Sequence, residues 1–265
     1  MGVRGPLSSL NMLVDTHAHL QWASFDKDRE KVISRAREAG VEYIVNIGFD
    51  VVGSRKGVEL AEKHEGLYAT VGIHPHNASQ FDRNVLDELR KLSEHPKVVA
   101  IGEIGLDYYR NLSPRKAQRS AFEAQLSLAE ELGLPVVIHD REAHKDTLEI
   151  LAKFKRRINC VMHCFSGSRE MAEQCVESGF YISFAGPVTF PNSHKLQAIA
   201  RLADLNKILL ETDSPWLAPQ EVRGKRNEPA FLPFIARKIA ELKEISIAEL
   251  AEATTNSAKQ IFQSG

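Results

Sequence analysis

Short apolar segments alternate with longer amphipathic segments along almost the whole chain, and this alternation constrains the fold more than any other feature. Helical patterns separate the apolar segments, and several of them end in a glycine, such as Gly40, Gly66 and Gly133, just before the next strand. A β–α alternation of this kind with eight strands predicts a (β/α)8 (TIM) barrel of the α/β class. The strand-like segments are Met12–Val14, Tyr43–Ile47, Tyr68–Ile73, Val98–Ile101, Pro135–Ile138, Cys160–Met162, Tyr181–Phe184 and Ile208–Leu210.

An open, doubly wound sheet is the alternative arrangement of such elements. That fold usually carries a glycine-rich phosphate-binding loop after its first strand, whereas the first strand here is followed by THAHLQWASFD, which contains no glycine. No linker or low-complexity segment divides the chain, so we expect residues 12–265 to form one barrel domain. Residues 1–11 show no periodicity, and we expect them to be a disordered extension or an expression remnant.

The composition restricts the partners and the compartment of the protein. Hydrophobic residues make up 43% and charged residues 26%, which is typical of a globular protein. The net charge is −1, so a nucleic acid would have to be held by a local patch. Three cysteines without a CxxC pair predict a reducing, cytoplasmic compartment. No apolar stretch approaches the roughly 18 residues that a membrane span requires, and no feature indicates an obligate protein partner.

Imidazole and carboxylate side chains follow the strand-like segments at the point where each apolar run stops. Six of the ten histidines lie at such positions. The carboxyl ends of barrel strands meet at one face, which carries the active site in enzymes of this fold. A single polar residue at a strand end is usually a cap or a satisfied buried group, but a set converging on one face indicates a functional site. The set comprises His17, His19, His74, His76, Glu103, His139, His163, Glu211 and Asp213.

This set predicts a metal site, because imidazoles and carboxylates are costly to bury together unless a cation compensates them. Residues i and i+2 of a strand point to the same side, so His17 and His19 can hold one ion together. Nitrogen and carboxylate ligands suit Zn²⁺, Mn²⁺, Fe²⁺ or Co²⁺, and Mg²⁺ fits a more oxygen-rich side. The ligands outnumber the needs of one four-coordinate ion. We therefore expect two divalent ions bridged by a carboxylate, with Glu103 as the bridge.

Five motifs in a fixed order resemble those of the TatD-type metal-dependent hydrolases, in the amidohydrolase-like barrel superfamily. They are DTHAHL, GIHPH, IGEIGLDYY, HCFSG and ETDSPWLAP, with RGKRNEP after the last. The HxH pattern alone is common to many metal-binding barrels, whereas the ordered set is specific. The resemblance implies a two-metal phosphodiesterase, typically a deoxyribonuclease supported by Mg²⁺ or Mn²⁺. It also implies metal ligation by His17, His19, Glu103, His139, His163 and Asp213.

The predicted reaction is hydrolysis of DNA phosphodiester bonds at single-stranded or accessible ends. Bound metals lower the pKa of a water, orient the phosphate and neutralise developing charge. We assign Asp213 as both metal ligand and general base, because its carboxylate can accept the proton of that water. Glu103 is the second predicted catalytic carboxylate.

Four residues are predicted to contact the substrate. His74 and His76 either donate to the phosphate or, for His76, orient a neighbouring side chain. Arg223 lies in the loop after the eighth strand, where such barrels bind phosphate, although a solvated basic loop explains it equally well. Arg141, two residues past His139, is a similar candidate. Aromatic residues beside the ligands, Tyr108, Tyr109 and Trp216, either stack on bases or pack around the site.

Two other functional classes fit part of these patterns. The same scaffold can hydrolyse an amide, a lactone or the ester of an aminoacyl-tRNA, since two metals activate water for these bonds as well. A non-enzymatic metal-binding protein fits less well, because a structural site is normally closed by four ligands.

Overall fold

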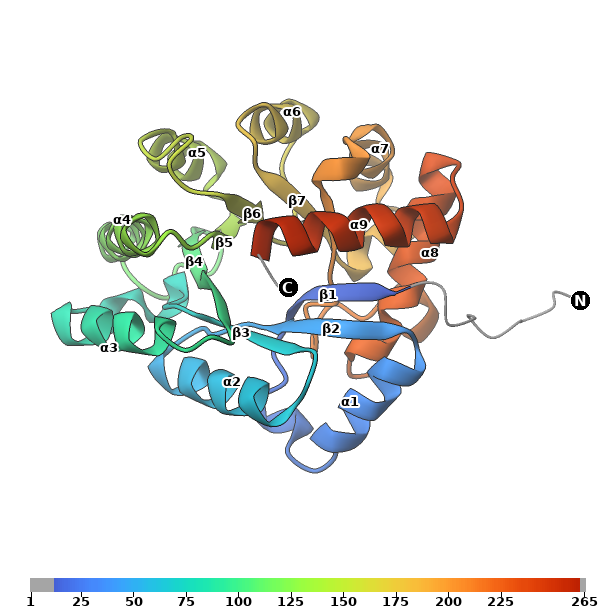
Figure 1. Ribbon diagram of the computed structural model, residues 1–265. Helices are drawn as coiled ribbons and strands as arrows, with labels where there is room; N and C mark the ends of the chain where they lie inside the picture. The colour runs from blue at the N-terminus through green and yellow to red at the C-terminus, as the bar shows by residue number, and fades with distance from the viewer. Residues whose placement is uncertain (1–11, 263–265) are drawn as a thin grey trace, which may run out of the picture.

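The computed structural model describes residues 12–262, so the expectation for residues 1–11 lies outside the described residues. Eight parallel strands pair in chain order, each with its neighbours (Figure 1), which confirms the predicted (β/α)8 barrel. The strands are β1 (Leu13–Ala18), β2 (Val41–Asn46), β3 (Leu67–Val71), β4 (Val98–Asp107), β5 (Val136–Arg141), β6 (Cys160–Met162), β7 (Tyr181–Phe184) and β8 (Ile208–Leu210).

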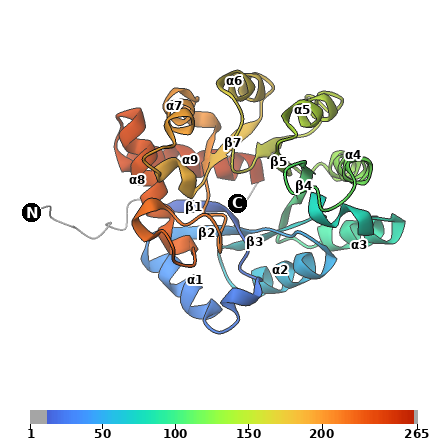
Figure 2. The ribbon, with the colours of Figure 1, turned by 180° about the vertical axis from the view of Figure 1, so that it is seen from behind.

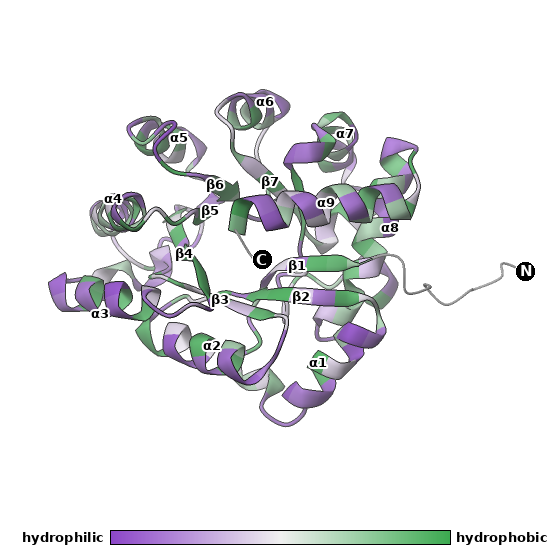
Figure 3. Cartoon of the chain, in the orientation of Figure 1, coloured by the Kyte–Doolittle hydropathy of each residue, from purple (hydrophilic) through white to green (hydrophobic). Residues whose placement is uncertain are grey.

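Helices cover the outside of the sheet, and the same ring is visible from the opposite side in Figure 2. Figure 3 shows the strands as mostly hydrophobic and the helices with hydrophilic stretches, as expected of amphipathic elements around a core. None of the helices among the described residues is long and apolar enough to cross a membrane. The helices are α1 (Arg29–Glu38), α2 (Val51–Lys63), α3 (Arg83–Ser93), α4 (Arg115–Leu132), α5 (His144–Ala152), α6 (Arg169–Glu177), α7 (His194–Leu202), α8 (Leu232–Lys243) and α9 (Ile247–Phe262).

The last helix, α9, closes the end of the barrel where the strands begin, and crosses in front of it in Figure 1. Thr255 Oγ1 donates to the carbonyl oxygen of Met12 at 2.8 Å, directly before β1. Ala258, Ile261 and Phe262 pack against the buried residues of the barrel interior, such as Val14. This end is therefore filled with apolar side chains. The opposite end, where the strands finish, is the one that carries the active site in barrels of this fold.

The seam between β1 and β8 closes at the carboxyl ends of the two strands. The backbone N–H of Asp213 donates to the carbonyl of His17, and that of His19 donates to the carbonyl of Ser214, each at 2.8 Å. Thr16 Oγ1 donates to the carbonyl of Leu210 at 2.9 Å. The residues that complete the barrel are therefore neighbours of, or identical with, the predicted metal ligands.

Three strands extend further than the apolar runs predicted. β1 runs to Ala18, β4 to Asp107 and β5 to Arg141, so His17, Glu103 and His139 lie within strands rather than after them. The prediction ended these three strands where the apolar run stops, but the backbone pairing continues because the polar side chains find partners inside the barrel mouth.

Candidate metal centre

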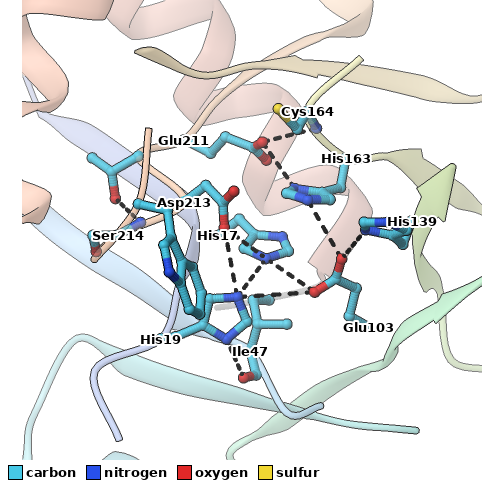
Figure 4. Close-up of polar contacts among 12 residues, drawn as sticks. His17, His19, Ile47, Glu103, His139, His163, Cys164, Glu211, Asp213 and Ser214 are labelled. Carbon is cyan, nitrogen blue, oxygen red and sulfur yellow. Dashed lines mark hydrogen bonds and ion pairs between the residues drawn. The ribbon is translucent and has the colours of Figure 1, made fainter. Parts of the chain in front are cut away.

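Glu103, on β4, lies at the centre of the cluster, with imidazoles on both of its carboxylate oxygens (Figure 4). Its Oε2 lies 3.5 Å from His17 Nε2 and 3.9 Å from His19 Nε2. Its Oε1 lies 2.7 Å from His139 Nδ1 and 3.5 Å from His163 Nε2. One buried carboxylate thus separates a β1 pair of imidazoles from a second pair supplied by β5 and the end of β6.

Asp213 joins the β1 side of the cluster. Its Oδ1 lies 3.7 Å from His17 Nε2 and 3.6 Å from His19 Nε2, while these two nitrogens lie 3.1 Å apart. His19 is oriented by its other ring nitrogen, which lies 3.0 Å from the carbonyl oxygen of Ile47. Such contact between a ligand histidine and a backbone carbonyl fixes the ring and its tautomer.

Glu211 supports the opposite side and was not among the predicted ligands. The side chain is fully buried, and its Oε1 lies 2.9 Å from His163 Nδ1. Glu211 also accepts hydrogen bonds from Ser183 Oγ at 2.6 Å and from the backbone N–H of Cys164 at 2.8 Å. His163 in turn stacks on His17, with ring centroids 3.6 Å apart. Glu211 therefore orients His163 from behind.

Asp107 is a further carboxylate of the site, and it was absent from the set of residues predicted from the sequence. It is fully buried, and its Oδ2 lies 3.2 Å from His139 Nε2 and 2.8 Å from His76 Nε2. Because Glu103 and Asp107 are four residues apart on one strand, they face the same side, and this spacing is the signal that was available. The predicted alternative in which His76 orients a neighbour agrees with this chain of contacts from His76 through Asp107 to His139.

His74 lies beside the central carboxylate, Glu103. Its Nε2 is 3.5 Å from Glu103 Oε1, and its side chain is largely buried. The ligand atoms of His74, Glu103 and His139 all lie within 4.8 Å of one another, so these three form one candidate metal-binding group. His17, His19 and Asp213 form another.

The seam next to the site is held by Asp15. This carboxyl group accepts hydrogen bonds from the backbone N–H of Thr212 at 2.9 Å, from Thr212 Oγ1 at 2.6 Å and from the backbone N–H of His17 at 3.3 Å. Asp213, one residue further, adopts a left-handed backbone with φ of 55°. Residues held in this conformation carry strain and cluster at functional sites. Asp15 thus fixes the segment that presents Asp213.

Burial opposes every charge in this cluster, and the pKa shifts show which groups compensate one another. Burial would lower the pKa of His139, but Asp107 and Glu103 raise it to about 9. Burial acts likewise on His163, where Glu211 and Glu103 raise the pKa to about 10. For Glu103 burial would raise the pKa, and the surrounding imidazoles bring it well below the usual value. The carboxylates therefore attract positive charge strongly.

The donor chemistry fits divalent metal ions. Imidazole nitrogens and carboxylate oxygens are the ligands of Zn²⁺, Mn²⁺ and related ions. Among the described residues, Nδ1 of His17 is buried without a hydrogen-bond partner, which marks a polar site whose groups are not all satisfied by protein. The carboxylates that raise the pKa values of His139 and His163 would also attract a divalent cation. Binding of the cation to these imidazoles would release their protons.

The two predicted arginine contacts lie at the periphery of the mouth. Arg141 is exposed at the end of β5, with its guanidinium 4.1 Å from the ring centroid of Tyr109. Arg223 is exposed in the β8–α8 loop, 4.6 Å from the ring centroid of Phe190. Neither arginine forms an ion pair with another described residue.

Arg226 and Tyr108, which are close in sequence to predicted site residues, form contacts within the protein. Arg226, in the same loop as Arg223, forms ion pairs with Asp28 at 2.7 Å. Tyr108 donates to Asp146 at 2.6 Å and packs under Arg115, so the predicted alternative of packing holds for it. Trp216, by contrast, keeps 43% of its surface exposed beside the site.

A parallel barrel with a histidine–carboxylate centre at the carboxyl ends of its strands is the architecture of metal-dependent hydrolases. The family model described as TatD related DNase matches residues 14–263. The chain belongs to this family of metal-dependent hydrolases, and the predicted resemblance is confirmed.

Similar proteins agree along nearly the full length. The chain is 44% identical over 253 residues to the uncharacterized metal-dependent hydrolase YabD of Bacillus subtilis, covering 95% of this chain and 99% of that protein. It is 40% identical over 257 residues to the 3'-5' ssDNA/RNA exonuclease TatD of Erwinia tasmaniensis, covering 94% and 99%. The crystal structure of YJJV, a TatD homolog from Escherichia coli, superposes with a TM-score of 0.91 at 31% identity, covering 97% and 100%.

Proposed function

We propose that this chain is a nuclease that uses two divalent metal ions to hydrolyse DNA phosphodiester bonds at single-stranded or accessible ends. The observation that carries this proposal is Glu103, a single buried carboxylate whose two oxygens face two separate groups of imidazoles. A bridging carboxylate between paired metals divides its oxygens in this way. The names of relatives such as the TatD exonuclease support nucleic acid as the substrate.

The ligands divide into two sets around Glu103. His17, His19 and Asp213 would hold one ion, and His139 and His163 the other. The large share of nitrogen ligands suits Mn²⁺ or Zn²⁺, and Mg²⁺ is the further candidate. His74 lies close enough to Glu103 to be a further ligand of the ion held by His139 and His163. We assign it this role in addition to its predicted contact with the phosphate.

When bound, the metals supply an activated water and neutralise charge on the phosphate. Asp213 is positioned to accept the proton of that water. Burial would raise the pKa of Asp213, but hydrogen bonding by His19 and the charges of the other imidazoles lower it, so the carboxylate stays ionised. Its side chain is 14% exposed, whereas Glu211 is fully buried, so of these two carboxylates Asp213 is the one within reach of solvent.

Side chains at the rim of the barrel mouth would contact the phosphate backbone of the substrate. Arg141 and Arg223 place guanidinium groups on exposed parts of the mouth, and each is held over an aromatic ring. His76 is anchored by Asp107 and retains 27% side-chain exposure, which leaves it able to donate to a phosphate oxygen. The cytoplasmic compartment predicted from the cysteines stays a prediction.

An end-labelled single-stranded oligonucleotide tests the function. We expect cleavage with Mn²⁺ or Mg²⁺ that a chelator abolishes, and a loss of at least about 100-fold in kcat for Asp213→Asn. Glu221→Gln, a charge-neutralising change in the adjacent exposed loop, is the matched control and should behave like the wild type. Cleavage that is absent, or is equal in Asp213→Asn and wild type, would contradict the proposal.

Metal analysis tests the two-ion assignment separately. We expect about two ions per chain after reconstitution and a clear loss of occupancy in Glu103→Gln, whose amide nitrogen cannot ligate. Fewer than one ion per chain in the wild type would refute the paired site.

A further inference from the structure

Two aromatic side chains lie against His19 beside the candidate metal centre, and a third connects them. The ring centroid of Trp216 lies 5.1 Å from that of His19, and the ring of Phe49 lies 5.9 Å from it. Trp22 connects the two, because its ring centroid is 5.1 Å from Trp216 and 5.1 Å from Phe49. The aromatic corner formed by Trp22, Phe49 and Trp216 therefore begins directly beside a proposed metal ligand.

The aromatic corner is open to solvent on the two indoles. Trp22 is 37% exposed and Trp216 is 43% exposed, which is unusual for large apolar side chains next to a buried polar site. Their ring planes meet at 67°, edge to face. This arrangement is a corner rather than a parallel slot, so a planar group can stack on one indole while its edge contacts the other.

Backbone hydrogen bonds fix both tryptophans relative to the proposed ligands. The N–H of Trp22 donates to the carbonyl of His19, and the N–H of Trp216 donates to the carbonyl of Asp213, each at 3.0 Å. Asn227 Nδ2 donates to the carbonyl of Trp216 at 2.6 Å. The backbone that carries each indole therefore keeps a defined position with respect to the metal centre, and the ring contacts with His19 and Phe49 orient the indoles.

An ion pair ties together the two loops that carry the indoles. Arg226, in the β8–α8 loop, donates to both carboxylate oxygens of Asp28, at 2.8 and 2.7 Å, and to the carbonyl of Ser24 at 2.6 Å. Asp28 and Ser24 follow β1 on the Trp22 side. Arg226 thus holds the aromatic corner in shape, a role distinct from the phosphate contact proposed for Arg223.

We propose that the aromatic corner is a stacking subsite for the terminal base of a single strand, adjacent to the bond that is cut. The inference rests on the proposed nuclease function. The corner begins 5.1 Å from the ring of His19, so it can receive a planar, largely apolar group attached to a phosphate at the metal centre, and a nucleobase is such a group. Stacking on indole depends on the π-face that every base has, so the subsite tolerates any sequence. It requires an unpaired base, and this selects single strands over duplex.

The tryptophan content of the chain makes binding directly observable. Both tryptophans of the protein lie in the aromatic corner, so intrinsic tryptophan emission reports on nothing else. We expect a trinucleotide, titrated with chelator present to prevent cleavage, to quench the emission saturably. The same trinucleotide with an abasic terminal position should quench far less. Equal quenching by both would refute stacking of the terminal base.

Steady-state kinetics test the consequence for cleavage. With single-stranded oligonucleotides, Trp22→Ala and Trp216→Ala should each raise KM at least about fivefold, with kcat within about twofold of the wild type. Trp→Phe at either position keeps a ring and should recover most of the affinity, which separates stacking from misfolding. Leu202→Ala, at an exposed apolar position on α7, is the matched control and should leave KM unchanged.

The design separates failure of the subsite from failure of the function. With an abasic end, the wild type should show the raised KM of the Ala variants, and the variants should lose nothing further. If the wild type and both Ala variants cut normal and abasic ends with equal KM, the subsite is refuted and the nuclease function stands. If the wild type cuts no single strand at all, the nuclease function falls and the subsite with it.

Discussion

Replacing Asp15 by alanine should destabilise the barrel at its closing seam. The carboxyl group satisfies three polar hydrogens, the backbone N–H of His17, the backbone N–H of Thr212 and the Thr212 hydroxyl. Asp15, His17 and Thr212 are each 0% exposed, so water does not replace the lost acceptor. An unsatisfied buried donor costs about 1–3 kcal/mol. Allowing for partial relaxation, we expect Asp15→Ala to lower the free energy of unfolding by about 3–6 kcal/mol.

Asp15→Asn is the matched control for this prediction. Burial raises the pKa of Asp15 to about 8, in spite of the hydrogen bonds that oppose the shift. The amide resembles the neutral acid in shape: its oxygen accepts the two backbone N–H groups, and its nitrogen can donate to the Thr212 hydroxyl. We expect Asp15→Asn to cost no more than about 1 kcal/mol.

Urea denaturation followed by circular dichroism and, independently, by tryptophan emission checks both values. At about 2 °C or more per kcal/mol for a chain of this size, Asp15→Ala should also unfold at least about 6 °C lower. Its kcat should fall together with its stability, because the seam presents His17 and Asp213 to each other. If Asp15→Ala were no less stable than Asp15→Asn, the seam would not depend on these hydrogen bonds and the reasoning would be refuted.

Three further predictions concern the periphery of the site and its support. Arg226 lowers the pKa of Asp28 to about 2; since the folded-state value is the lower one, the stabilisation is present above the ordinary pKa of about 4 and is lost as the pH falls toward 2. The stability difference between the wild type and Asp28→Asn should thus be about 1 kcal/mol or less at pH 6 and shrink below pH 4 in urea titrations. Gly105→Ala should cost roughly 3 kcal/mol or more by thermal melting, because Gly105 has a φ of 138° and an added Cβ would lie 2.0 Å from the carbonyl oxygen of His139. Glu211→Gln should reduce metal affinity about 10- to 100-fold by calorimetry, and an unchanged affinity would exclude its orienting role.

The barrel itself was predictable because its signal is local. Each buried parallel strand is a short apolar run, and each crossover helix has an apolar side and a stop signal, so eight repeats of the unit specify the architecture. The ends of the strands were not predictable. Glu103 and Asp107 are polar and lie in the second half of a ten-residue strand, and no apolar pattern marks a strand that continues among polar partners.

The residues of the candidate site were predictable where strand alternation sets their direction, and less so elsewhere. His17 and His19 stand two apart at the end of β1, so chain position alone suggests that they face the same side. Glu211 and Asp213 are also two apart, but they follow β8 and Asp213 has a φ of 55°, so alternation does not set their directions. Which carboxylate faces the ions and which supports a histidine depends on contacts across the barrel. Glu211 is separated from His163 by 48 positions in the chain, and their 2.9 Å contact exists only after closure.

The same dependence on closure explains why so many charges are tolerated in one place. Isolated burial of Glu103, Glu211 and Asp213 would cost several kcal/mol each, yet these groups are compensated by imidazoles from other strands. Compensation requires every strand to be in register, and register is locked at the β1–β8 seam by bonds that involve His17 and Asp213 themselves. A variant that removes one charge therefore disturbs the closing of the barrel as well as the site, so stability and metal affinity should change together in Glu211→Gln. A charge change in an exposed loop, such as Glu221→Gln, should alter neither.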